Sequence, residues 1–249
     1  MQAAPQVNVD ETSWPMPAKR GWLWTAVAET ATCFRLHLSR RQEGLKALLG
    51  ATYRGLVMSD RLATYDLLPD RQRQVCWAHL VRNVRALDER YGAETGWARA
   101  VLAQSDTLFF AWHLYRGGWL DRVGLQQALL PVRYGLRDLL ETGTTSPHTQ
   151  IAGFSRKLLR RWGSLFAFCG SEGIEPTNNA AERALRHAVL WRKGSFGSRS
   201  DDGCRFVERL LSVRATCSQQ GLSLFAFLTE AVRAAWAGEP TPSLIALSP

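Results

Sequence analysis

Short apolar segments alternate with turn-like junctions over the first 40 residues of the chain. Three segments are rich in Val, Trp, Phe and Leu, and they cover residues 6–14, 21–29 and 32–38. Pro and polar residues separate them, as is typical of strands joined by tight turns. In the third segment apolar residues alternate with Arg35 and His37, the period-two pattern of a half-buried strand. The pattern predicts three consecutive antiparallel strands, with the third toward a sheet edge.

A helix and two further strands follow. Leucines recur at helical spacing within residues 40–49, and residues 55–59 form a continuous apolar run. Such a run is typical of a parallel strand that is buried on both faces. A short strand over residues 73–77 leads into a helix from His79 to Tyr91. This order predicts an α/β fold with a mixed sheet.

The remainder of the chain has helical periodicity. Residues 93–170 contain helical patterns only, and three more helices are predicted over residues 177–191, 201–220 and 223–236, with a loop over 194–200. We therefore expect a sheet domain that begins with residues 1–92, an all-helical insertion over 93–172, helices within 173–238 that complete the sheet domain, and a flexible tail over 239–249.

Composition narrows the class of protein. The 249 residues are 46% hydrophobic, which is enough for a sizeable core, and the net charge of +9 favours polyanionic partners. The five cysteines form no C-x-x-C pair, which favours a reducing compartment over a disulfide scaffold. No basic leader precedes an apolar stretch, and no run approaches the ~18 apolar residues that span a bilayer. We expect a cytoplasmic protein with no membrane partner.

Three acidic residues are the candidates for chemistry. Asp10 is expected to end the first strand on the face opposite Val7 and Val9, and Asp60 follows the buried strand. The ends of neighbouring strands share a crevice in open α/β sheets, so the two carboxylates should meet there. Each also has an ordinary interpretation, as a turn residue for Asp10 and as a helix N-cap for Asp60. Glu182 lies on a predicted helix beside an apolar stripe, and this helix would aim its carboxylate at the same place.

Converging carboxylates repel one another unless a cation lies among them. Oxygen ligands suit Mg²⁺ or Mn²⁺ better than zinc. Asp10, Asp60 and Glu182 are therefore predicted to hold two such ions, an arrangement that performs phosphoryl transfer by in-line displacement.

Four sequence blocks occur in an order that resembles the insertion sequence 66 family of bacterial transposases. They are Val9-Asp10-Glu11-Thr12, Met58-Ser59-Asp60-Arg61, Cys76-Trp77-Ala78-His79 and Thr177-Asn178-Asn179-Ala180-Ala181-Glu182-Arg183-Ala184-Leu185-Arg186. The resemblance runs from about residue 7 to residue 230. Arg183 stands where the family pattern has it, whereas Arg186 comes one position early.

The resemblance implies a ribonuclease H-like sheet with flanking helices, in which Asp10, Asp60 and Glu182 form a catalytic DDE triad. It also implies a helical insertion between the second and third acids. The expected activity is metal-dependent cleavage and strand transfer at element ends, with element and target DNA as partners, an oligomer of the chain on DNA, and association with the bacterial nucleoid. Family members carry an additional N-terminal region, and from the resemblance we expect this chain to lack it. A related nuclease that cuts without joining, and an inactive or truncated remnant that only binds DNA, remain alternatives.

Other residues of these blocks are expected to contact DNA. The candidates are His79, Asn178, Asn179, Arg183, Arg186, Trp191, Arg192 and Lys193. Carboxylates cannot hold a phosphate backbone without cations nearby, which favours this role for the basic members, and Trp191 is a candidate for base stacking. For His79, a zinc half-site with Cys76, a hydrogen-bonding or DNA-contacting role and an ordinary histidine at a helix start all remain open.

Overall fold

The computed structural model describes residues 1–17 and 19–245, and it divides into two compact units. The first, here called the sheet unit, comprises Met1–Leu67 and Asn178–Pro249. The second, here called the helical unit, comprises Leu68–Thr177. Together they confirm the predicted α/β class.

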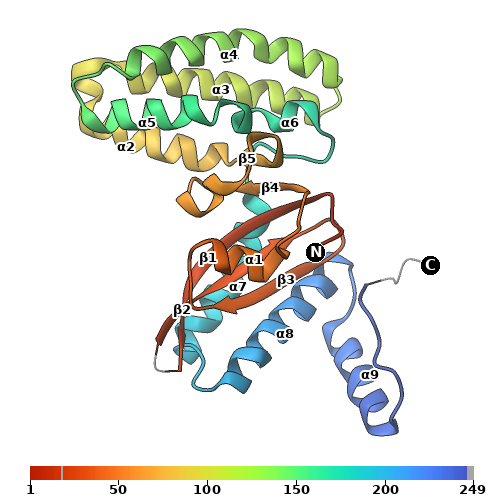
Figure 1. Cartoon of the computed structure of the whole chain (residues 1–249). Coiled ribbons are helices and arrows are strands. Elements are labelled where there is room, and N and C mark those ends of the chain that lie inside the picture. Colours follow the sequence, from red (N-terminus) through yellow and green to blue (C-terminus); the bar gives the residue numbers. More distant parts are fainter. Residues whose placement is uncertain (18, 246–249) are drawn as a thin grey trace. The chain divides into compact units, whose positions relative to one another are not determined.

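The strands of the sheet unit form an antiparallel meander with one parallel addition (Figure 1). Neighbouring strands follow the order β3-β2-β1-β4, and their bounds are β1 Gln6–Met16, β2 Lys19–Val27, β3 Thr32–His37 and β4 Leu56–Ser59. β1 pairs antiparallel with β2, β2 pairs antiparallel with β3, and β4 pairs parallel with β1. The three predicted antiparallel strands and the buried parallel strand are confirmed.

The first strand is longer than the sequence predicts. β1 does not end at Asp10 or at residue 14, because it stays paired with β2 from Asn8 to Met16. Its pairing with β4 covers only Gln6 to Asn8. Asp10 therefore lies in the middle of β1, just beyond the stretch that β4 covers, and the expectation that it ends the strand is wrong.

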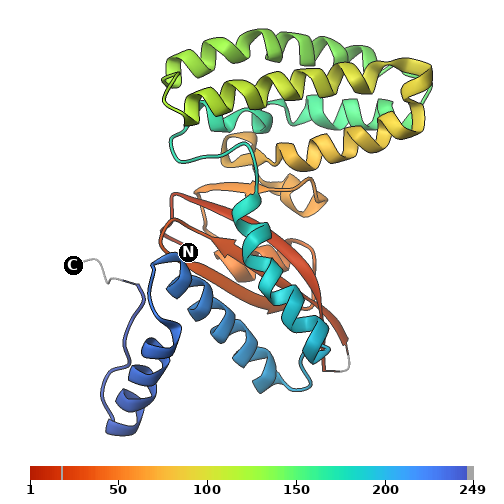
Figure 2. The ribbon, with the colours of Figure 1, turned by 180° about the vertical axis from the view of Figure 1, so that it is seen from behind.

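Helices cover both faces of these strands (Figures 1 and 2). α7, Asn179–Ser195, and α8, Asp201–Gln219, pack on one face, whereas α1, Gln42–Leu49, packs on the other. α9, Leu224–Ala237, contacts α8. The core between the strands and the α7–α8 pair contains Trp14, Leu23, Phe34, Leu36, Leu185, Ala188, Cys204, Val207 and Leu211. The 3₁₀ helix η1, Ala63–Leu67, follows β4.

The helical unit begins earlier in the sequence than predicted. Its strand, short 3₁₀ helices and α-helices are β5 Arg73–Val75, η2 Asp70–Gln72, η3 Trp162–Leu165, α2 Trp77–Thr95, α3 Trp97–Arg116, α4 Arg122–Gly143, α5 Thr149–Arg160 and α6 Ala167–Gly170. The unit starts at Leu68 rather than at residue 93, because α2 packs along α3 and β5 contacts η3. Between residues 93 and 170 the structure has only helices and their connections.

The described C-terminal residues that follow α9 have no regular secondary structure. Residues 239–245 form neither helix nor strand, and the rest of the tail predicted over 239–249 lies outside the described residues. Among the helices that the structure describes, none combines the length and the apolar character needed to cross a membrane.

Candidate active site

The parallel pairing of β1 and β4 places Asp10 and Asp60 at the same level. Gln6 pairs with Leu56 and Asn8 pairs with Met58, so the register offset is 50 positions. The same offset separates Asp10 from Asp60. Residues at matching positions of paired strands point to the same face, so continuing the register brings the two carboxylates together beside the end of β4.

Each of these carboxylates also makes a local hydrogen bond. The backbone N–H of Leu62 donates to Asp60 Oδ1 at 2.8 Å, which turns the chain out of β4 toward η1. The N–H of Glu11 donates to Asp10 Oδ1 at 2.8 Å. The bond from Leu62 makes Asp60 a turn residue ahead of η1, which begins at Ala63, so the structure does not show the helix N-cap that would start at Arg61.

A buried asparagine joins the start of α7 to β1. The Asn178 amide donates to the Val9 carbonyl at 2.8 Å, and Asn8 Nδ2 donates to Asn178 Oδ1 at 3.0 Å. Val9 and Asn8 flank Asp10 on the N-terminal side, so α7 begins directly beside this acid. Glu182 lies four residues after Asn178, one helical turn further on, and the buried stripe of Ala181, Leu185 and Ala188 keeps that side of α7 on the strands.

The electrostatics of Asp10 reflect this crowding. Burial is the main cause that raises the pKa of Asp10 to about 7, and the negative charges of Glu11, Asp60 and Glu182 contribute to the same rise. The structure therefore brings the three predicted acids of β1, β4 and α7 within electrostatic reach of one another.

Glu11 is a fourth acid, and the sequence analysis gave it no role. Its side chain is 1% exposed on the face of β1 opposite Asp10. Arg40 Nη2 lies 2.9 Å from Glu11 Oε1, and the Tyr65 hydroxyl donates to Oε2 at 2.7 Å. Burial raises the pKa of Glu11, although both partners act to lower it. The alternation of Val7, Val9 and Glu11 was the available signal, because it places an acid on a buried face where it needs partners.

The basic residues of α7 occupy two environments. Arg183, Arg186 and Lys193 are exposed, as is Asn179. Arg192 is half-buried, and its Nη1 donates to Thr12 Oγ1 at 2.9 Å and to the backbone oxygen of Ser13. Arg192 therefore attaches the end of α7 to β1. The exposed side chains of Arg183, Arg186 and Lys193 stay available to a ligand.

One of the predicted DNA contacts is not available in this structure. Asn178 is fully buried, and its amide is committed to β1, so it positions α7 instead of touching DNA. Trp191 is half-buried against the core and makes an edge-to-face contact with Phe206 at 6.2 Å between centroids. Base stacking by Trp191 stays a prediction.

His79 belongs to the helical unit. It lies in the first turn of α2, where the N–H of Trp77 donates to the Pro176 carbonyl at 2.8 Å. His79 is half-buried there. A DNA contact for this residue stays a prediction.

Comparisons with known proteins identify the family of this chain. The sequence profile described as "Transposase IS66 family" matches residues 1–205. A relative in Sinorhizobium fredii (strain NBRC 101917 / NGR234), "Uncharacterized protein y4qI", is 23% identical over 273 aligned positions, which cover 98% of this chain and 50% of the relative. The chain thus spans about half the length of that relative. No solved structure shows significant similarity to this chain. The chain belongs to the IS66 family of transposases.

Proposed function

We propose that the sheet unit is the catalytic domain of a DDE transposase, with a ribonuclease H-like arrangement of strands and helices. In this proposal Asp10, Asp60 and Glu182 form the triad. The observation that supports it most is the β1–β4 register, which sets Asp10 level with Asp60, and the raised pKa of Asp10, to which Asp60 and Glu182 contribute, agrees with it. A cluster of acids that repels itself without a cation gains stability when a cation binds.

The donor set fits divalent metal ions of the hard type. All three side chains offer carboxylate oxygens, the ligands that Mg²⁺ and Mn²⁺ prefer. When bound, two such ions would lower the pKa of an attacking water or 3′-hydroxyl and neutralise charge on the leaving oxygen. Asp10 and Asp60 would hold them from the strands, and Glu182 would hold them from α7.

The other residues of the site position DNA and the acids. Exposed Arg183 and Arg186 follow Glu182 on α7, where their guanidinium groups would bind phosphate oxygens of the substrate. Asn178 fixes the start of α7, and Glu11 with Arg40 and Tyr65 makes β1 rigid from behind. The nucleophile attacks phosphorus in line, and the bond from phosphorus to the 3′-oxygen breaks. Cleavage uses water, whereas strand transfer uses the freed 3′-hydroxyl.

Plasmid nicking tests the proposal. Wild-type protein should convert supercoiled plasmid to open circles with Mg²⁺ or Mn²⁺ and should not do so in EDTA. Asp60→Asn should abolish nicking while circular dichroism stays unchanged, because the variant keeps the side-chain volume but removes a charged ligand. Asp106→Asn, an exposed acid on α3, is the matched control and should nick normally. Full nicking by purified Asp60→Asn protein would reject the triad.

Strand transfer separates transposase from nuclease. A labelled duplex with a free 3′-hydroxyl at an element end should become joined to target plasmid in the wild type. Nicking without joined product under any metal would favour the nuclease alternative.

A further inference from the structure

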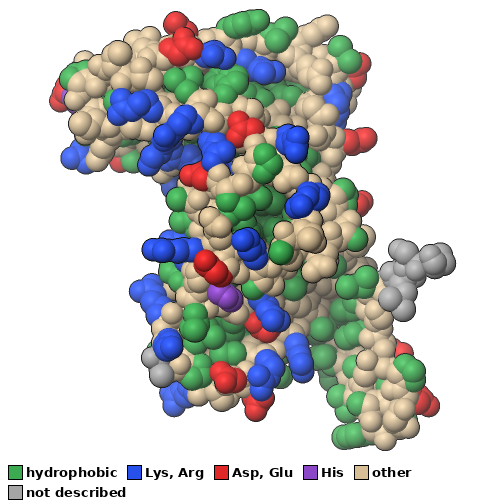
Figure 3. Space-filling model, in the orientation of Figure 1, with side chains coloured by type: hydrophobic (Ala, Val, Ile, Leu, Met, Phe, Trp, Pro, Cys, Tyr) green, Lys and Arg blue, Asp and Glu red, His purple; other side chains and the backbone are tan. Residues whose placement is uncertain are grey.

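A pocket of about 570 Å³ lies where the β1–β2 connection meets the end of α7. Two strands and the α7–α8 loop contribute its walls, which are formed by Ser13, Pro15, Lys19, Arg20, Arg192 and Phe196. Among the described residues that line it, three are basic and none is acidic. Lys and Arg side chains are visible around this connection at the lower left of Figure 3. The pocket therefore suits an anion.

Phe196, which lines this pocket, has an unusual backbone conformation. It follows α7 with φ at 60°, and it is the only non-glycine residue with positive φ in the described chain. Glycine is the residue that normally ends a helix in this conformation, because a side chain there is strained. The Phe196 side chain is 77% exposed, so it contributes little to the core in return. A strained and exposed aromatic residue points to a role outside the fold itself.

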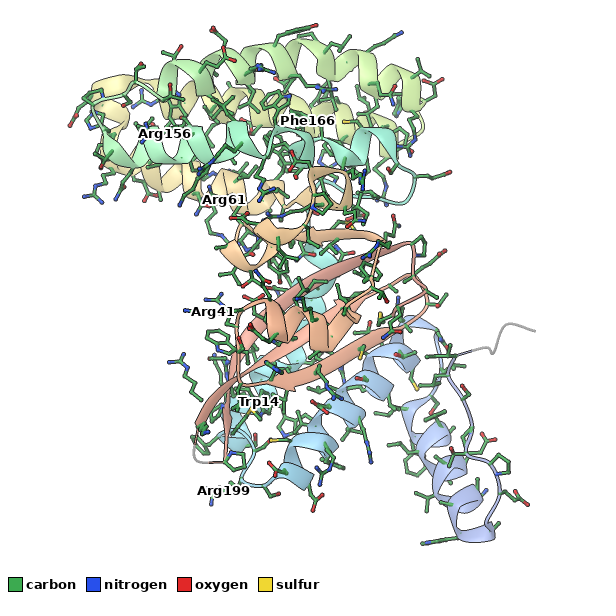
Figure 4. All side chains as sticks on the ribbon, viewed as in Figure 1. Trp14, Arg41, Arg61, Arg156, Phe166 and Arg199 are labelled. Atoms are coloured by element: carbon green, nitrogen blue, oxygen red, sulfur yellow. The ribbon has the colours of Figure 1, made fainter. Side chains whose placement is uncertain are left out.

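The loop after Phe196 is fixed to β1. The N–H of Ser198 donates to the Pro15 carbonyl at 2.9 Å, and Trp14 Nε1 donates to Ser198 Oγ at 3.1 Å. A Cβ atom on Gly197 would lie 2.4 Å from the Pro15 oxygen, so only glycine fits there. Figure 4 shows Trp14 on β1 and Arg199 projecting from the same loop. Phe196 is thus held in place by its neighbours and does not depend on packing of its own ring.

The basic residues that line the pocket with this ring differ in how far they are anchored. Arg192 is anchored to Thr12 and Ser13, whereas Lys19 and Arg20 are exposed. Flat aromatic surface beside cations binds nucleotides, because the ring stacks on a base and the cations bind its phosphates. Inside a duplex the neighbouring base pairs cover both faces of each base, so away from the duplex ends only an unpaired base can stack in this way.

We propose that this pocket binds an unpaired nucleotide of the DNA substrate, with the base stacked on Phe196 and the adjacent phosphates near Lys19 and Arg20. The inference rests on the proposed function in so far as it takes DNA as the ligand. It adds a second contact, for single-stranded DNA, to the phosphate contacts of Arg183 and Arg186.

Fluorescence anisotropy with the full chain tests the pocket. The probes are a fluorescein-labelled single-stranded oligothymidine of about 20 nucleotides and a blunt duplex of equal length, both in EDTA at low salt. Phe196→Gly should bind the single strand roughly 5- to 150-fold more weakly, the range for loss of one base–aromatic stack, and should bind the duplex as the wild type does. Its melting temperature should be equal or higher, because glycine relieves the strain.

Two controls keep the result specific. Phe196→Tyr should restore single-strand binding, and Phe225→Ala, which removes an aromatic ring that is 82% exposed on α9, should leave it unchanged. Equal weakening for both probes, or wild-type single-strand affinity in Phe196→Gly, would overturn the proposal. Plasmid nicking is scored separately in the wild type, so a protein that does not nick but shows Phe196-dependent binding supports the pocket and rejects the catalytic proposal.

Discussion

The Asn8 side-chain amide donates a hydrogen bond to Asn178 Oδ1 at 3.0 Å, although 170 positions separate the two residues in the chain. Asn8 lies on β1 two residues before Asp10, and Asn178 lies four residues before Glu182. The pair therefore aligns the two segments that carry the first and third acids. Both asparagines belong to the sheet unit, so the hydrogen bond lies within that unit.

Asn178→Ala should destabilise the protein and reduce nicking. The change leaves the buried Val9 carbonyl without this partner, which costs about 1–3 kcal/mol, and the half-buried Asn8 amide also loses its acceptor. Nicking per folded molecule should also fall, because Glu182 loses its alignment with Asp10. Urea unfolding and plasmid nicking measure the two effects.

The neighbouring asparagine is the matched control for that variant. Asn179 is exposed at the start of α7, so Asn179→Ala should change stability by less than about 0.5 kcal/mol. Equal stability of both variants would contradict a structural role for Asn178 and return it to the candidates for DNA contact.

Arg40→Ala should lower stability through Glu11. The buried carboxylate of Glu11 would keep the Tyr65 hydroxyl but lose its ion pair with Arg40. Leaving a buried acceptor short of a partner costs about 1–3 kcal/mol, reduced here because the Arg40 side chain is 42% exposed. Arg41→Ala, at the adjacent exposed position, should have little effect, and a similar loss in both variants would show that Glu11 does not need its partner.

The pKa of Asp10 predicts how stability depends on pH in the absence of metal. Its folded-state value of about 7 lies above the unfolded value of 3.8, so the folded protein binds this proton more tightly. The resulting stability is complete below pH 3.8 and is lost as pH rises through 7. The loss is on the order of a few kcal/mol.

Denaturant unfolding in EDTA at pH 5 and pH 8 checks this dependence. Asp10→Asn cannot ionise, so it should lose less stability between the two pH values and should exceed the wild type at pH 8. Mg²⁺ or Mn²⁺ should stabilise the wild type more at pH 8 than at pH 6, since binding competes with the proton. Parallel pH profiles for the two proteins would contradict the assignment of Asp10.

The sequence was sufficient for the elements that repeat a simple pattern. Alternation identified the meander, the apolar run identified β4, and the stripe through Leu185 identified the buried side of α7. The extent of β1 was missed because its last residues are held by pairing with β2 and not by alternation. The helical unit begins at Leu68 because α2 packs on α3, a tertiary contact that helical periodicity does not reveal.

Side-chain roles were harder to predict than positions. Asn178 stands in a block rich in DNA-contact candidates, yet its side chain is buried and donates a hydrogen bond to β1. Burial depends on the rotation of α7 about its axis, which the sequence fixes only to within a residue or two. A positive φ outside glycine has no sequence signal, so the sequence gives no indication of the role that we propose for Phe196.

The exposed basic residues of α7 predict the salt dependence of duplex binding. Each phosphate neutralised should contribute ~0.9 to the slope of log K against log salt. Arg186→Ala should therefore reduce the magnitude of this slope by ~0.9, the contribution of one phosphate contact. Arg205→Ala should leave the slope unchanged, because Arg205 is already paired with Asp202. Contacts to phosphates carry no base information, so duplexes of element-end and random sequence should bind with near-equal affinity. Competition at fixed salt decides this point, since a preference of ~1,000-fold for the end sequence, the lower bound for specific binders, would place a base-reading surface within these residues.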